Sequence, residues 1–169
     1  RLYEGELADS GRALVWWRRV SEADEYDQEA LVSLDRLHMD AQEWGALTEV
    51  IRRRLDQGDG VQNADLRCRL GRLLEGVEND ISASVELHRS VLWDEPSHLG
   101  SRHELERLAA YPEYRETIAD VLTPIYERSE SWSKLSILTE MRLDITEDTQ
   151  ERAALWLAAA ELRIEQMND

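Results

Sequence analysis

The segment from Leu66 to Pro96 constrains the fold most, because its pattern is that of two helices joined by a short turn. Leucines recur on one helical face in its first half, and apolar residues stand four apart in its second half. These positions are Leu66, Leu70, Leu73, Leu74, Ala83, Leu87 and Val91. Glu78-Asn79-Asp80 interrupts the pattern, and Pro96 ends it because proline disfavours a helix interior. The segment predicts a helical hairpin.

Internal matches show that this hairpin is part of a repeat. A shift of 71 residues places Leu2-Tyr3-Glu4-Gly5 on Leu73-Leu74-Glu75-Gly76. In the second half, Trp132, Leu135 and Leu138 match Trp44, Leu47 and Val50 at an offset of 88. Leu155 and Glu161-Leu162 match Leu66 and Arg72-Leu73 at an offset of 89. The increase in offset is about the length of one helix, which predicts one unpaired helix between the matching parts.

The hairpin resembles the tetratricopeptide repeat family. The resemblance rests on Leu70-Gly71, Leu74, Ala83, Leu87 and Pro96, which stand at the spacing of that family. The 71-residue shift is about two of its 34-residue hairpins with short loop additions. The resemblance implies a right-handed superhelix of hairpins whose usual role is to bind proteins and peptides.

The sequence pattern predicts an all-α fold of about ten helices with an irregular joint near 97–112, and the resemblance implies that these helices form a right-handed α-solenoid. We expect a single repeat domain over 1–169 that is a segment of a longer repeat protein, since the pattern begins and ends within a repeat. The expected elements are hairpins over 1–22, 27–57, 62–93 and 113–146, an extra helix over 97–110 and a terminal helix over 150–167. No segment alternates apolar and polar residues as a half-buried strand does.

Local signals refine this interpretation. Asp27 is expected to cap the helix that follows it, and Asp148 with Glu151 resembles a capping box. Pro124 should kink or split the helix over 113–128.

Either the helix over 113–128 or the one over 97–110 is the extra, unpaired helix. Leu122, Tyr126 and Trp132 stand at tetratricopeptide spacing, so the resemblance favours pairing 113–128 with 131–146.

Net charge limits the classes of partner. The formal net charge of −16 argues against nucleic acid and against anionic membranes, which both need a basic surface. A basic protein or peptide fits this charge better. No apolar run is long enough to cross a bilayer, so direct membrane insertion is not expected. Cys68 is the only cysteine, which rules out an intramolecular disulfide and leans the location toward the cytoplasm.

The residues show no pattern of catalysis or metal binding. His98 and His103 are five apart, and His103-Glu104 has no second histidine at zinc-protease spacing. Asp56-Gln57-Gly58-Asp59-Gly60 lacks the alternating ligands and the distal glutamate of a calcium loop. No phosphate-binding glycine loop or nucleophile-elbow motif is present. We expect no cofactor, no metal site and no enzymatic activity.

The resemblance also implies a binding surface, because the first helix of each tetratricopeptide hairpin lines the concave groove. Two groups of residues would form it: Glu29, Val32, Arg36 and Met39, then Asp65, Cys68, Arg72 and Glu75. The family's carboxylate clamp is absent, yet Arg36 and Arg72 could anchor acidic or backbone groups of a peptide. The expected function is a protein-interaction module or scaffold. The alternatives are a structural spacer and a regulatory helical domain that binds a small ligand.

Aromatic residues suggest two further contacts. Trp44 and Trp132 start equivalent helices and are expected to pack between hairpins, whereas one of Trp16 and Trp17 is expected to be exposed. Apolar residues at both ends would normally cover a neighbouring repeat, which predicts end-to-end self-association. These residues are Leu2, Tyr3, Leu162 and Ile164.

Overall fold

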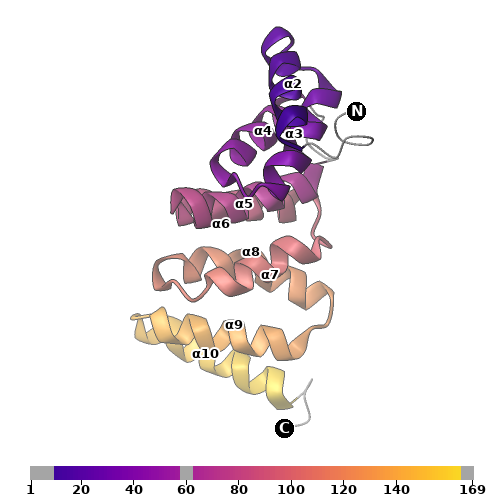
Figure 1. Cartoon of the computed structure of the whole chain (residues 1–169). Coiled ribbons are helices and arrows are strands. Elements are labelled where there is room, and N and C mark those ends of the chain that lie inside the picture. Colours follow the sequence, from indigo (N-terminus) through magenta and orange to yellow (C-terminus); the bar gives the residue numbers. More distant parts are fainter. Residues whose placement is uncertain (1–9, 58–62, 165–169) are drawn as a thin grey trace. The chain divides into compact units, whose positions relative to one another are not determined.

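The computed structural model describes residues 10–57 and 63–164 (Figure 1). This part of the chain is helical without strands, which confirms the all-α prediction. Its helices are α2 (Ser10–Ala23), α3 (Gln28–Asp40), α4 (Trp44–Gln57), α5 (Ala64–Glu78), α6 (Ile81–Asp94), α7 (Leu99–Leu108), the 3₁₀ turn η2 (Pro112–Tyr114), α8 (Arg115–Arg128), α9 (Trp132–Ile145) and α10 (Thr149–Leu162). The first nine residues of the hairpin predicted over 1–22, which include Leu2 and Tyr3, lie outside the described residues, as does the end of the terminal helix predicted over 150–167.

The chain divides into two compact units, Arg1–Ser84 and Val85–Asp169, whose boundary falls inside α6. Within the first unit, each helix packs against the next: α2 on α3, α3 on α4 and α4 on α5. Within the second unit, α7 contacts α8, α8 packs along α9, and α9 packs along α10. Consecutive packing is the arrangement expected of helical repeats, because each element buries its apolar face against its neighbours.

The core of the first unit forms where α3 meets α4. Leu31, Leu34 and Val50 are buried together, and Trp17 of α2 packs against them. Val20 stands three residues after Trp17, a spacing that would bring it to the inner face of α2, but it is 37% exposed. The buried stripe of α2 instead runs at fourfold spacing through Ala13 and Trp17 to the buried Ser21, so Val20 lies beside it.

The side chains of Asp27 and Asp148 cap the helices that follow them. The Asp27 side chain accepts a hydrogen bond from the Ala30 amide at 2.7 Å. The Asp148 side chain accepts from the amides of Gln150 and Glu151 at 2.9 and 2.8 Å. These bonds satisfy amides at a helix start that have no partner within the helix. They fix where α3 and α10 begin.

The turn between α3 and α4 recurs between α8 and α9. Gln42 (φ 57°) and Glu130 (φ 52°) both adopt the left-handed conformation. The next amide bonds back across the turn in each case, from Glu43 to the His38 carbonyl at 2.9 Å and from Ser131 to the Tyr126 carbonyl at 2.9 Å. The residues that form the second turn each lie 88 residues after their counterparts in the first, which is the offset found in the sequence. The hairpins α3–α4 and α8–α9 are therefore equivalent. This turn, with the packing of α8 along α9, favours pairing these two helices. That α7 is the additional helix stays a prediction.

Pro124 lies inside α8, which continues unbroken from Arg115 to Arg128, so the helix is not split there. Proline removes one amide donor and leaves the carbonyl of Asp120 without its intrahelical bond. Pro124 and Asp120 are both exposed, so water can satisfy that carbonyl. The helix therefore tolerates proline on its solvent side.

Candidate functional site

The four predicted binding residues on α3 form a continuous exposed face. Glu29, Val32, Arg36 and Met39 are all exposed, and Val32 and Met39 are 48% and 39% exposed. Their spacing of three and four residues keeps them on one side of the helix. Arg36 forms an ion pair with Asp40 at 3.6 Å, so its guanidinium is already engaged within α3.

The predicted residues on α5 do not form an equally open face. Asp65 and Arg72 are exposed and Glu75 is half-buried, but Cys68 is only 4% exposed. Cys68 lies on the inner stripe of α5 with the buried Ala64 and Gly71, at helical spacing. Its thiol therefore contributes no exposed surface for a partner.

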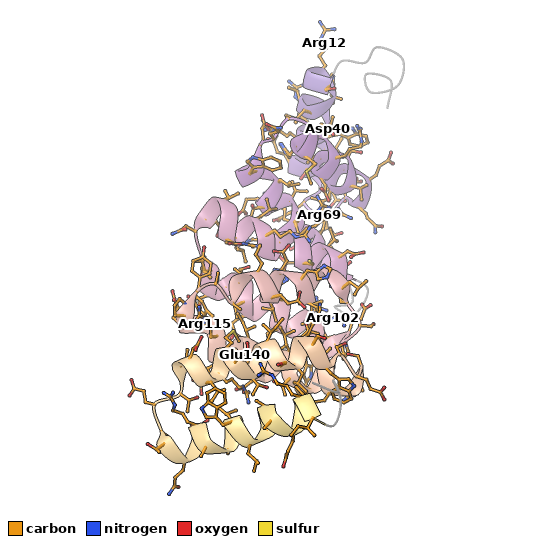
Figure 2. All side chains as sticks on the ribbon, turned by 90° about the horizontal axis from the view of Figure 1, so that it is seen from below. Arg12, Asp40, Arg69, Arg102, Arg115 and Glu140 are labelled. Atoms are coloured by element: carbon orange, nitrogen blue, oxygen red, sulfur yellow. The ribbon has the colours of Figure 1, made fainter. Side chains whose placement is uncertain are left out.

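A buried charge cluster joins α3 to α4 and α5 in the first unit. The Asp35 carboxylate, on a residue only 4% exposed, accepts hydrogen bonds from Arg54 of α4 and from Arg69 of α5. Arg69, labelled in Figure 2, binds with both terminal nitrogens, at 2.6 Å to Oδ1 and 3.1 Å to Oδ2. Two-point guanidinium binding fixes both distance and angle between helices. The cluster fills the space between α3 and α5.

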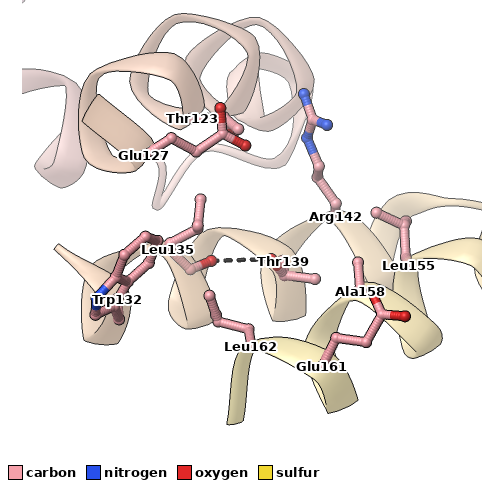
Figure 3. Close-up of a pocket in the computed structure, with 10 residues that line it drawn as sticks. All are labelled: Thr123, Glu127, Trp132, Leu135, Thr139, Arg142, Leu155, Ala158, Glu161 and Leu162. Carbon is pink, nitrogen blue, oxygen red and sulfur yellow. Dashed lines mark hydrogen bonds between the residues drawn. The ribbon is translucent and has the colours of Figure 1, made fainter. Parts of the chain in front are cut away.

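The second unit has a groove between α8 and α10, with α9 as its floor (Figure 3). Its volume is about 380 Å³. We call it the α8–α10 groove; it is lined by Thr123, Glu127, Trp132, Leu135, Thr139, Arg142, Leu155, Ala158, Glu161 and Leu162. Leu135 is buried in the floor, while Trp132, Leu155 and Leu162 are half-buried and contribute apolar surface. The groove can therefore take up apolar side chains.

The helices around the groove correspond in sequence to the helices that hold the charge cluster in the first unit: α8 to α3, α9 to α4 and α10 to α5. At the offset of 88, Thr123 corresponds to Asp35 and Arg142 to Arg54. At the offset of 89, Ala158 corresponds to Arg69. The carboxylate is therefore replaced by an uncharged side chain of similar size, and one of its two guanidinium partners by a methyl group, which leaves space between the helices.

The charges of the groove come mainly from two glutamates. Glu127 and Glu161 are exposed, and within residues 10–57 and 63–164 neither carboxylate forms an ion pair or a side-chain hydrogen bond. Arg142 is bound to Asp120 of α8, outside the lining, so its charge is already balanced. The groove therefore presents two carboxylates that are available to a cationic ligand.

Equivalent tryptophans behave differently in the two units. Trp44 was predicted to pack between hairpins, but it is 41% exposed. Trp132 is half-buried and lines the groove. Of the adjacent pair in α2, Trp16 is the exposed member at 50%, and Arg19 lies over its ring at 4.9 Å. Trp17 packs inward, as one residue of such a pair must.

A second polar cluster ties α7 to the α8–α9 hairpin. Glu106 of α7 accepts a hydrogen bond from the buried Tyr126 hydroxyl and another from Lys134 Nζ at 2.5 Å. Burial alone would raise the pKa of the Glu106 carboxyl, but the bonds from Lys134 and Tyr126 outweigh it and lower that pKa. Burial and the Glu106 carboxylate both raise the pKa of the Tyr126 phenol, which keeps the hydroxyl a donor.

We expect the Glu106 cluster to make the stability of the second unit depend on pH. Folding lowers the pKa of this carboxyl below its ordinary 4.5, so its contribution is complete above pH 4.5 and is lost as the pH falls further. Glu106→Gln should lower the urea midpoint at pH 7 by more than it does at pH 3. The exposed Glu113 supplies a control, Glu113→Gln, which should change neither midpoint. Equal losses from Glu106→Gln at both pH values would contradict this linkage.

The described residues contain no group of three or more His, Cys, Asp and Glu side chains arranged to hold a metal ion. None of the helices in the described part combines the length and apolar character that crossing a bilayer demands.

The chain matches no protein-family model and no curated protein.

Proposed function

We propose that this chain is a tetratricopeptide-like module, a right-handed helical solenoid that binds a segment of a protein partner. It acts as a scaffold and not as an enzyme. The observation that carries the proposal is the α8–α10 groove, which combines apolar lining with one available carboxylate on α8 and another on α10. Such a combination suits a peptide segment, because apolar contacts give affinity and charges give selectivity.

The position of the groove in the hairpin order supports this function. α8 and α9 form one hairpin, and α10 begins after the next cap, so α8 and α10 are both first helices. In the family that the sequence resembles, first helices line the concave binding surface. The exposed face of α3, with Glu29, Val32, Arg36 and Met39, has the same place in its own hairpin and would be a binding surface of the first unit.

The proposal is tested by capture of partners on the immobilised chain, with one groove residue and one matched outer residue changed. Leu155 lines the groove, whereas Leu157 on the same helix is 62% exposed and does not. Leu155→Glu should abolish capture of a specific protein, and Leu157→Glu should retain it. Circular dichroism must first show equal helix content in both variants.

The alternative functions predict other results. If both variants capture the same proteins as the unchanged chain, the groove is not the binding surface. If the unchanged chain captures nothing specific, the structural spacer becomes the better account.

A further inference from the structure

The first unit shows which kind of side chain binds between α3 and α5, the first helices of two successive hairpins. There the Arg69 guanidinium reaches from α5 to the Asp35 carboxylate on α3, and Arg54 approaches from α4. Arg69 is half-buried in this place and Asp35 is almost fully buried. The chain's own structure thus contains an arginine side chain bound between equivalent helices.

The second unit lacks that arginine. Ala158 stands at the position of Arg69, is exposed, and lines the α8–α10 groove (Figure 3). Its methyl group leaves empty the space that a longer side chain would fill from α10. An arginine supplied by another molecule could enter this space from solvent.

The carboxylates of the second unit also stand at other positions than the carboxylate of the first unit. The carboxylate of Asp35 is replaced by Thr123, but Met39 and Arg72 correspond to Glu127 and Glu161. The lining therefore loses one buried carboxylate and gains two exposed ones, which form no ion pair within the described residues. An incoming cation would meet a carboxylate from α8 and one from α10.

The lining favours a guanidinium over a compact ammonium. A guanidinium is planar and weakly hydrated, so it stacks on aromatic rings and bonds to oxygens at its edge. Trp132 offers a half-buried aromatic ring, and the two glutamates offer oxygens. The stem of an arginine side chain would contact Leu155 and Leu162.

We propose that the α8–α10 groove binds an arginine side chain on a protein segment, an inference that rests on the function proposed above. The partner segment carries arginine next to an apolar residue. Its positive charge complements both the groove and the formal net charge of −16 of the chain.

The test measures binding of two fluorescein-labelled octapeptides to the full chain by anisotropy. One alternates leucine with arginine, and the other has glutamine at each arginine position. Ala158→Arg supplies the missing arginine from within, which should occupy the groove. Ala154→Arg is the matched control, since Ala154 is an exposed residue one turn earlier on α10 that does not line the groove. The two variants carry the same net charge.

The arginine peptide should bind the unchanged chain about tenfold more tightly than the glutamine peptide. Ala158→Arg should weaken it about tenfold more than Ala154→Arg does, and Glu127→Gln with Glu161→Gln should weaken it similarly. Equal weakening by the two arginine variants would overturn the groove as the binding place, because it would show only a general effect of charge. Equal binding of both peptides would overturn the arginine selectivity. That second result would leave the proposed function standing, since it is tested separately through Leu155 and Leu157.

Discussion

Asp35→Ala is expected to destabilise the first unit by about 3 kcal/mol, because it removes the carboxylate that the guanidinium groups of Arg54 and Arg69 both bind. Asp35 is 4% exposed, and the side chains of its partners are 23% and 31% exposed. The loss should therefore be large, although water reaches both arginines in part. Amide hydrogen exchange measures it locally, as faster exchange throughout α3, α4 and α5.

Asp40→Ala is the matched control on the same helix. Asp40 pairs with Arg36 at 3.6 Å, but their side chains are 65% and 54% exposed. Exposed pairs of this kind contribute less than about 1 kcal/mol. If Asp35→Ala and Asp40→Ala have equally small effects, the charge cluster does not hold α3 to α5.

Tyr126→Ala is expected to destabilise the second unit by about 3–5 kcal/mol, the usual cost of removing a buried aromatic side chain. Tyr126 is 1% exposed, and it lies where α8 meets the carboxylate from α7. Tyr126→Phe keeps the ring and removes only the hydroxyl, so it should cost about 1 kcal/mol. Urea unfolding at pH 7 compares the two variants.

The size of the difference identifies the source of the stability. A phenylalanine variant as unstable as the alanine variant would mean that the bond to Glu106 outweighs the packing of the ring. Tyr26→Ala, at a tyrosine that is 60% exposed, should leave the urea midpoint almost unchanged.

The helices were predictable because their signals are local. Leucine spacing placed the buried face of α5, and Asp27 and Asp148 marked helix starts through side chains that bond within three residues. Even so, the turns at Gln42 and Glu130 could not be identified from residue type, since neither is a glycine. Only their position two residues before Trp44 and Trp132 connects them.

The charge cluster was missed because its members are far apart in the sequence. Asp35 lies on the leucine stripe of α3, which is a signal of burial, but its partners are 19 and 34 residues away. Arg54 belongs to Arg52-Arg53-Arg54, whose sequence alone does not show which arginine points inward. Cys68 was placed in the groove by resemblance, whereas packing buries it. Pairwise contacts between helices decide such positions.

The α8–α10 groove exists because α10 carries no large side chain at Ala158. Only a comparison with the equivalent position in another repeat, Arg69, reveals this difference. The offsets of 88 and 89 align Arg69 with Ala158 and Asp35 with Thr123. Only the structure shows that Asp35 and Arg69 bind each other, so that their joint replacement opens a space. The contact between Asp35 and Arg69 in one repeat therefore identifies the α8–α10 groove in the other as a candidate binding site.

Binding of a partner segment in the α8–α10 groove can be measured by calorimetry, by titrating the captured partner against three chains. These are the unchanged chain, Leu155→Glu and Leu157→Glu. A buried charge in an apolar contact should weaken binding about a hundredfold in Leu155→Glu, with Leu157→Glu within about twofold of the unchanged chain. Equal dissociation constants for the two variants would contradict binding in this groove and place the binding surface elsewhere.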